Sequence, residues 1–269
     1  MMNGAHAATG VLTGVGLAAV MQAPPAALAA SALVGAGAAL LPDIDHDQAT
    51  ITRSSGPITR GVAEVLQALA RAVYRTTRLP HDPEATGKVG EHRGLIHAPV
   101  FALLLGTALA LGTLASPWVA IAATYLLTSA AIRSLRWSLP LPGPARRILA
   151  AGLTPPLVAA AATYGLVQAG ALHQVGPWLG LIVAAGMIVH SLGDGMTNSG
   201  IPFLWPKRRR CDRCRDTAAV CAGARWDRQN VLPRALRWSA GARREVVIRL
   251  GCLALAGLIA WPSLGPLVS

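Results

Sequence analysis

Histidine and aspartate residues that could bind a metal ion occur in four short segments of the 269-residue chain. In order, the segments contain His6; Asp43, Asp45 and His46; His92 and His97; and His190 and Asp194. His190 and Asp194 are four residues apart, so a helix would present both side chains on one face. Neutral imidazole and carboxylate ligands together suit zinc, manganese or iron, and such a mixed set can hold two ions that activate a water. The pattern therefore predicts a divalent-metal site.

Two of these segments contain further residues that suit the same chemistry. Pro42 and the acids after it favour a turn that can aim the carboxylates of Asp43 and Asp45 inward. Arg93 precedes His97 by four residues and is expected on the same helix face. Its guanidinium could then hold a phosphate or a carboxylate through two hydrogen bonds. Taken singly, a histidine near a helix end also fits an interfacial cap, and an Asp-x-Asp pair also fits a simple turn.

The elements that carry these residues are predicted to be membrane-spanning helices. Hydrophobic residues make up 53% of the chain and charged residues only 13%, roughly half the charged fraction of an average soluble domain. Four stretches contain no Lys, Arg, Asp or Glu: 11–41, 95–132, 148–189 and 250–269. Because a helix of about 20 apolar residues crosses a bilayer, these stretches must hold several spans. Ionisable residues at membrane depth are costly and usually functional, which favours a metal site over isolated caps and turns.

Breaks at proline and glycine divide the apolar stretches into seven predicted helices. They are expected at 5–21, 25–41, 97–115, 117–133, 147–168, 177–193 and 247–264. The first two are short enough to form a hairpin that barely crosses, so six or seven spans are predicted. Pro155 and Pro156 should kink the fifth helix. The expected fold is an all-α, polytopic transmembrane helical bundle.

The basic residues predict the orientation of this bundle, since cytoplasmic loops collect Lys and Arg. Residues 194–246 hold 12 of the 24 Lys and Arg residues, and residues 133–147 hold four more. Alternating outward from these two loops places the N-terminus and the 42–96 loop in the cytoplasm as well. The sequence thus predicts a multi-pass plasma-membrane protein whose metal-type segments all lie at the cytoplasmic face.

Two segments are predicted to lie outside the spans. Residues 57–78 carry apolar side chains at helical spacing, which indicates either an amphipathic helix on the anionic inner leaflet or an ordinary packing helix. Residues 207–246 form a basic loop that is expected to anchor on acidic lipid, with nucleic acid as a less simple partner. Its Cys211, Cys214 and Cys221 are one ligand short of a closed structural zinc site, so reduced cysteines are expected.

Five sequence strings resemble one protein family. They are NGAH at 3–6, LPDIDH at 41–46, HRGLIH at 92–97, HSLGD at 190–194 and TNSGIPFLWP at 197–206. On these strings the chain resembles the YdjM-like inner-membrane-associated proteins. This bacterial group is named for a LexA-controlled member and is classed as metal-dependent hydrolases. The resemblance covers about residues 1–206, and residues 207–246 depart from it.

The resemblance implies roles for individual residues. The implied metal ligands are His6, Asp43, Asp45, His92, His97, His190 and Asp194. Asp45, His46 and Arg93 would take part in the chemistry, and Thr197 and Asn198 would bind substrate together with Arg93. A fainter similarity, through the His-x-x-x-Asp pair at 190–194, is to the zinc phospholipase C and nuclease superfamily. It implies phosphoester hydrolysis at a site of two or three zinc ions, whereas the residues alone predict one to three divalent ions.

Three hypotheses for function follow. The first is a membrane-bound hydrolase that uses zinc, or else manganese or iron, to activate water at the cytoplasmic face, with a lipid or lipid-linked phosphoester as substrate. The second is a non-enzymatic scaffold or metal-handling protein of a stress response. The third is a membrane-associated nuclease. In each case residues 1–206 would form the membrane-embedded domain, residues 207–246 the basic loop and residues 247–269 a last transmembrane helix.

Overall fold

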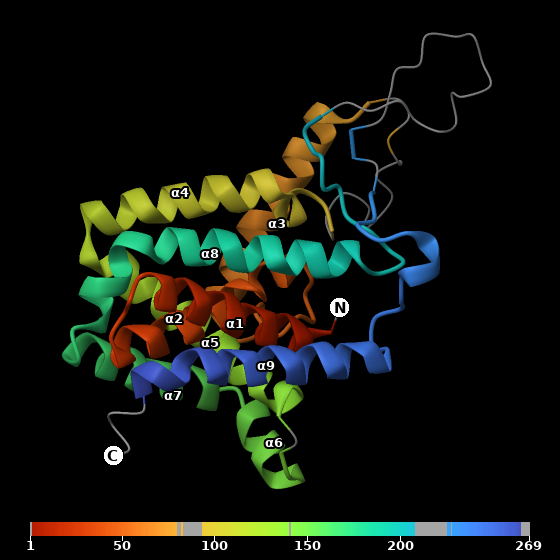
Figure 1. Ribbon diagram of the computed structural model, residues 1–269. Coiled ribbons are helices and arrows are strands. Elements are labelled where there is room, and N and C mark those ends of the chain that lie inside the picture. Colours follow the sequence, from red (N-terminus) through yellow and green to blue (C-terminus); the bar gives the residue numbers. More distant parts are fainter. Residues whose placement is uncertain are drawn as a thin grey trace, which may run out of the picture.

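The structure is a computed structural model that describes residues 2–79, 82, 93–139, 141–207, 225–226 and 228–264. The regular elements of these residues are all helices. Two isolated β-bridges occur, but the described residues form no β-strand. The helices, shown in Figure 1, are α1 (Asn3–Val20), α2 (Pro25–Ala38), α3 (Pro57–Thr77), α4 (Pro99–Ala115), α5 (Pro117–Ser138), α6 (Gly143–Ala150), α7 (Thr154–Gln168), α8 (Ala171–Gly195) and α9 (Arg243–Leu264). The short 3₁₀ turns η1 (Leu41–Asp45) and η2 (Leu95–His97) follow α2 and precede α4. The predicted all-helical fold is confirmed.

Prolines mark the start of several apolar helices. Pro25, Pro99 and Pro117 stand in the first turn of α2, α4 and α5, where a residue without an N–H group loses no helical hydrogen bond. These three helices begin within two residues of their predicted starts, but α8 begins at Ala171, six residues before the predicted start at Pro177, which lies inside the helix. A helix occupies each of the seven predicted segments.

The fifth predicted segment, 147–168, differs from the expectation of one kinked helix. The chain forms two helices there, α6 and α7, which meet at 75°. Pro155 and Pro156 stand in the first turn of α7. A proline deeper in a helix would remove a hydrogen bond and clash with the carbonyl one turn earlier, so the prolines begin a new helix instead of kinking an existing one.

Four helices are long and apolar enough to cross a membrane: Pro25–Asp45, Pro117–Arg136, Ala171–Gly195 and Arg243–Ser263. The bent pair of α6 and α7 would be a fifth span if both parts cross together, and α4 is apolar but shorter. Among the described residues, the chain therefore has four or five candidate spans. The prediction of six or seven spans is not confirmed.

Small residues let the central helices approach one another closely. In Figure 1, α8 runs between α4 on one side and α1 and α2 on the other. A side chain at Gly14 would collide with the backbone carbonyl of Ser31 on α2, and one at Gly106 would collide with the carbonyl of Gly180 on α8. Small residues of this kind are typical of helix packing in membranes. The start of α1, the end of α8 and the start of α9 lie at the same end of the bundle.

The loop after α2 contains the predicted helix, observed as α3. Ala63, Ala70 and Tyr74 are buried, whereas Val65 and Leu69 are exposed. The helix packs against η1 and η2, so α3 covers the two turns that carry metal-type residues. Contact between its exposed apolar side chains and lipid stays a prediction.

Candidate metal centre

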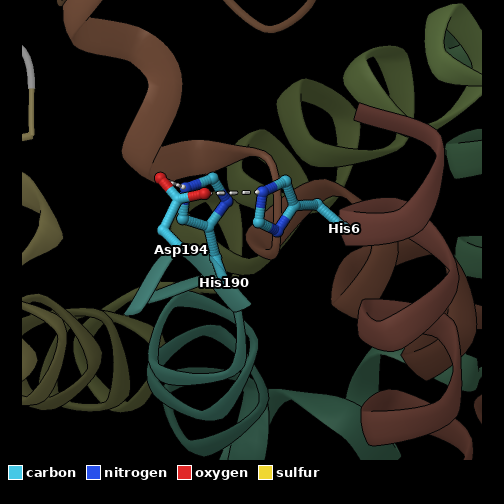
Figure 2. A group of neighbouring side chains, drawn as sticks. All are labelled: His6, His190 and Asp194. Carbon is cyan, nitrogen blue, oxygen red and sulfur yellow. Dashed lines mark ion pairs between the residues drawn. The ribbon is translucent and has the colours of Figure 1, made fainter. Parts of the chain in front are cut away.

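Six metal-type side chains from four elements meet at the end of the bundle where α1 begins. They are His6 on α1, Asp43 and Asp45 on η1, His97 on η2, and His190 and Asp194 on α8. The three histidines are fully buried, Asp45 and Asp194 are almost so, and Asp43 is partly exposed. Figure 2 shows His6 and His190 both facing the carboxylate of Asp194. Each of the four sequence segments therefore contributes at least one side chain to this cluster.

Local structure explains how each side chain reaches this point. His190 and Asp194 lie one turn apart on α8 and share a face, as their spacing predicts. After α2 ends, Pro42 opens the 3₁₀ turn η1, and this tight turn directs Asp43 and Asp45 back toward α8 and η2. A second 3₁₀ turn places His97 directly before the first residues of α4.

Four distances between ligand atoms approach those of a tetrahedral metal site. The Nε2 atoms of His97 and His190 each lie 3.7 Å from Oδ1 of Asp43 and 3.7 Å from Oδ2 of Asp194. A tetrahedral zinc ion with ligands at about 2.1 Å has ligand–ligand distances of about 3.4 Å. Each of the two imidazole nitrogens thus lies between carboxylate oxygens at distances slightly longer than those of two ligands of one ion.

His190 provides the strongest sign that a cation belongs there. Its Nδ1 lies 2.7 Å from the carbonyl oxygen of Ala39, and a carbonyl can only accept, so Nδ1 carries the proton. In the neutral ring, Nε2 then presents a lone pair to the carboxylates of Asp43 and Asp194. A buried lone pair beside two carboxylate oxygens favours a bound cation, in addition to the guanidinium of Arg93 that contacts Asp194. A histidine held by a backbone carbonyl is also the usual arrangement of a metal ligand.

His6 extends this set of ligands. Its ring stacks on that of His190 with centroids 3.7 Å apart, and its Nε2 lies 3.3 Å from Oδ1 of Asp194. His6, His190 and Asp194 form one group with ligand atoms within 4.8 Å of one another, and Asp43, His97 and His190 form another. Since His190 has only one nitrogen left for a metal, it can serve one ion at a time. Buried His and Asp groups that could bind a metal are therefore present.

Asp45 lies behind His97. Its Oδ2 is 3.5 Å from Nδ1 of His97 and accepts a hydrogen bond from the backbone N–H of Arg93 at 3.1 Å. Burial lowers the pKa of His97, but Asp45 above all, together with Asp43 and Asp194, raises it to about 9. Asp45 was predicted to be a ligand, but it belongs to neither metal group. It is placed to orient His97 through Nδ1, while Nε2 of His97 faces Asp43 and Asp194.

Arg93 reaches the centre by a different route from the one its spacing predicts. Residues 93–97 form no α-helix: Arg93 has a φ of +58° and precedes the 3₁₀ turn η2. The expected shared helix face with His97 is therefore wrong, because Pro99 starts α4 only after both residues. The guanidinium nevertheless arrives beside the ligands, with Nη2 3.0 Å from Oδ2 of Asp194.

A family model for YdjM inner membrane proteins matches residues 1–262. The chain belongs to the YdjM inner membrane protein family. The match extends beyond the resemblance over residues 1–206. It includes residues 207–246, which were predicted to depart from the family. No curated protein and no solved structure matches the chain. Together with the apolar helices, the match establishes an inner membrane protein.

Other predicted site residues of this YdjM-family chain lie at different distances from the centre. Thr197 is buried beside it: its hydroxyl donates to the carbonyl of Asp194 and lies 3.4 Å from Nη1 of Arg93. Asn198 is exposed and donates to Ser239, away from the ligands. His46 is half-buried, its Nδ1 accepts from the N–H of Gln48, and it joins neither metal group. His92 lies outside the described residues, as do the three loop cysteines.

Two features around the centre could not be predicted from the sequence. Ser191, buried on α8, donates to the carbonyl of His97 at 2.7 Å and so joins η2 to α8. Residues 228–231 return from the basic segment onto the 195–201 stretch, where Asn230 donates to the carbonyl of Thr197 and the Val231 N–H donates to that of Gly195. This contact brings Arg228 within electrostatic range of Arg93 and Asp194. The family match, which continues to residue 262, is the one sequence observation that links residues 228–231 to the rest of the protein.

Proposed function

We propose that this protein is a membrane-bound, metal-dependent hydrolase that cleaves a phosphoester, carried by a lipid or a lipid-linked molecule, at the cytoplasmic face. The observation that supports it most is the buried Nε2 of His190, whose lone pair faces two carboxylate oxygens at 3.7 Å. Burying such a set without a cation would be costly. An ion bound there would explain why the charges are collected inside a membrane protein.

The donor set fits a borderline metal such as zinc, with manganese or iron as alternatives. Asp43, His97 and His190 would hold one ion, and His6 and Asp194 offer ligand atoms for a second. A bound divalent ion would supply a Lewis acid and a water of lowered pKa. Asp45, whose Oδ2 lies beside Nδ1 of His97, would keep the His97 ring in one orientation.

Arg93 is the residue best placed to select a phosphoester. Its Nη2 already contacts Asp194, and its side chain is 13% exposed, as is part of Asp43 (18%), while the three histidines are buried. A guanidinium has five N–H donors in a planar fork, so Arg93 can hold an anionic substrate against the ligand set while it keeps Asp194. Arg228 adds positive charge nearby, and the hydroxyl of Thr197 fixes the neighbouring backbone.

The proposed orientation follows the basic residues. Arg133, Arg136, Arg243 and Arg244 stand at the same end of their helices as the metal centre, and cytoplasmic ends collect such residues. The exposed Val65 and Leu69 of α3 would then rest on the inner leaflet next to the site. A lipid or lipid-linked substrate could thus reach the centre from the membrane.

A metal-handling protein without catalysis is the second candidate, and burial favours it. His6, His97 and His190 have no exposed surface, which suits the retention of an ion more than turnover of a bulky substrate. Both candidates require bound metal, and they differ in whether an ester is cleaved.

Hydrolysis assays on the full-length protein in nanodiscs separate these functions. The substrates are phospholipids, soluble phosphomonoesters and phosphodiesters, and single-stranded DNA, each with chelated protein and with zinc or manganese restored. We expect metal-dependent release from a phospholipid or a phosphoester, lost in Asp43→Asn but retained in the control Asp47→Asn, which alters an exposed residue of the same loop. Bound metal with no hydrolysis of any substrate would reject the hydrolase in favour of metal handling, and cleavage of DNA alone would indicate a nuclease.

A further inference from the structure

A second polar site lies on the other side of the first turn of α1. A cavity of about 430 Å³ is enclosed by the starts of α1 and α9, the end of α5 and the loop after η1. Its polar lining comprises Asn3, Gln48, Thr50, Arg136, Glu245 and Arg249. We call it the arginine pocket. None of the metal-type residues described above lines it.

Positive charge dominates the surroundings of this pocket. Arg136 and Arg249 line it, and Arg53 and Arg133 lie within electrostatic range of Arg136. The opposing charge in the lining is Glu245, which is buried and accepts a hydrogen bond from the N–H of Met2 at 2.9 Å. Four arginines against one glutamate leave a positive excess that an anion would neutralise.

Arg133 shows that this excess reaches into the protein. It stands three residues before Arg136 on α5, so both side chains project from neighbouring positions of one helix face. Only 8% of Arg133 is exposed, and its Nε and Nη1 atoms have no hydrogen-bond partner among the described residues. A buried guanidinium with unused donors is costly unless a ligand supplies acceptors.

A smaller apolar groove lies beside the pocket. It has a volume of about 110 Å³ and is lined by residues of α1, α2, α5 and α9, among them Leu135 and Leu253, which are one and four positions along the chain from Arg136 and Arg249 of the pocket. The outer helix α9 packs on α1 but leaves most of its surface exposed. The groove is thus bordered by a helix that faces the bilayer.

We propose that the arginine pocket binds the headgroup of an anionic phospholipid, one of whose acyl chains lies in the adjoining groove. A phosphate offers acceptors to several guanidinium donors at once, and basic pockets between transmembrane helices are suited to lipid headgroups. The position of an apolar groove beside a cationic cavity favours a lipid over a free phosphate ion. This site does not depend on the hydrolase proposal.

The test measures lipid binding to the full-length, metal-free protein in detergent. Dioctanoyl phosphatidylglycerol, dioctanoyl phosphatidylcholine and inorganic phosphate are added, and binding is followed by native mass spectrometry and by the shift of the apparent Tm. We expect phosphatidylglycerol to bind about tenfold more tightly than phosphatidylcholine, since only its headgroup carries a net charge for the arginines. Equal binding of the two lipids, or a phosphate effect as large as that of phosphatidylglycerol, would overturn the proposal.

Variants locate the binding. The double variant Arg136→Gln/Arg249→Gln should lose the preference for phosphatidylglycerol, whereas Arg146→Gln/Arg147→Gln, which removes two exposed charges from α6, should keep it. Loss in both variants would mean general surface attraction and refute a specific pocket. If the first variant does not fold, Glu245→Gln gives an independent test. Removal of the opposing charge should tighten binding of phosphatidylglycerol, and unchanged or weaker binding would contradict the assignment.

Discussion

The first turn of α1 separates two sites of opposite charge. Toward α8, contacts of 3.7 Å or less connect three carboxylates, three imidazoles and one arginine, a formal charge of −2 when the imidazoles are neutral. Toward α5 and α9, the arginine pocket and its neighbours hold four arginines and one glutamate. The first set suits a divalent cation, and the second suits an anion. Each site collects charge of one sign that a bound partner would neutralise.

The two sites also differ in how they are built. The metal centre is assembled from α1, η1, η2 and α8 by side chains that contact one another. The arginine pocket is an open cavity beside a lipid-facing helix. Changes at the metal centre should therefore have large effects on metal affinity, whereas changes at the pocket should depend on which lipid is present.

Removal of one carboxylate from the metal centre should have the largest effect. Asp194→Asn takes away an oxygen that lies near His97 and His190, and it leaves Arg93 without its ion-pair partner. We expect zinc affinity, measured by titration calorimetry, to fall by more than about 100-fold, since even residues behind the ligands are worth 10–100-fold. Phosphatidylglycerol binding should not change. A parallel loss at both sites would show that the variant disturbs the whole bundle.

Asp45→Asn should have a smaller effect, because Asp45 touches His97 from behind. We expect a loss of about 10–100-fold in zinc affinity. The same titration with Asp47→Asn, an exposed neighbour, should match the wild type. A loss as large as that of Asp194→Asn would instead make Asp45 a direct ligand.

At the pocket, the sign of an effect should depend on the lipid. Arg133→Met removes a buried guanidinium with unused donors, so without anionic lipid it should stabilise the protein by about 1–3 kcal/mol. Thermal unfolding should show a higher apparent Tm in phosphatidylcholine and a smaller gain, or a loss, in phosphatidylglycerol. The same Tm change in both lipids would mean that Arg133 takes no part in binding the anionic lipid.

Ser191→Ala should have the smallest effect. The hydroxyl makes one hydrogen bond to the carbonyl of His97, and a bond of this kind contributes about 1 kcal/mol. Zinc affinity should fall by about fivefold. An unchanged affinity would show that η2 is held in place by its other contacts alone.

The sequence was a good guide to the helices and to the ligands that lie on them. Apolar stretches and prolines predicted where helices begin, and the four-residue spacing predicted that His190 and Asp194 share a face. Asp43 and Asp45 were expected to point inward from a turn, and η1 has this form. These features are local, so residue order and helix geometry determine them.

Features that depend on contacts between distant segments could not be predicted in the same way. The carbonyl of Ala39 fixes the proton of His190, yet a backbone atom leaves no mark in the sequence. Arg93 was expected on a helix, but a positive φ and a 3₁₀ turn bring it to Asp194. The return of residues 228–231 onto Gly195 likewise arises from a non-local hydrogen bond within a basic segment that lacks apolar periodicity.

Metal content gives the most direct test of the metal centre. Full-length protein without an affinity tag is loaded with zinc, freed of excess ion and analysed by inductively coupled plasma mass spectrometry. The wild type and His173→Ala, which alters an exposed histidine on the same helix, should retain about one equivalent or more, whereas His190→Ala should retain almost none. Retention of no more zinc by the wild type than by His190→Ala would contradict a metal centre at these residues.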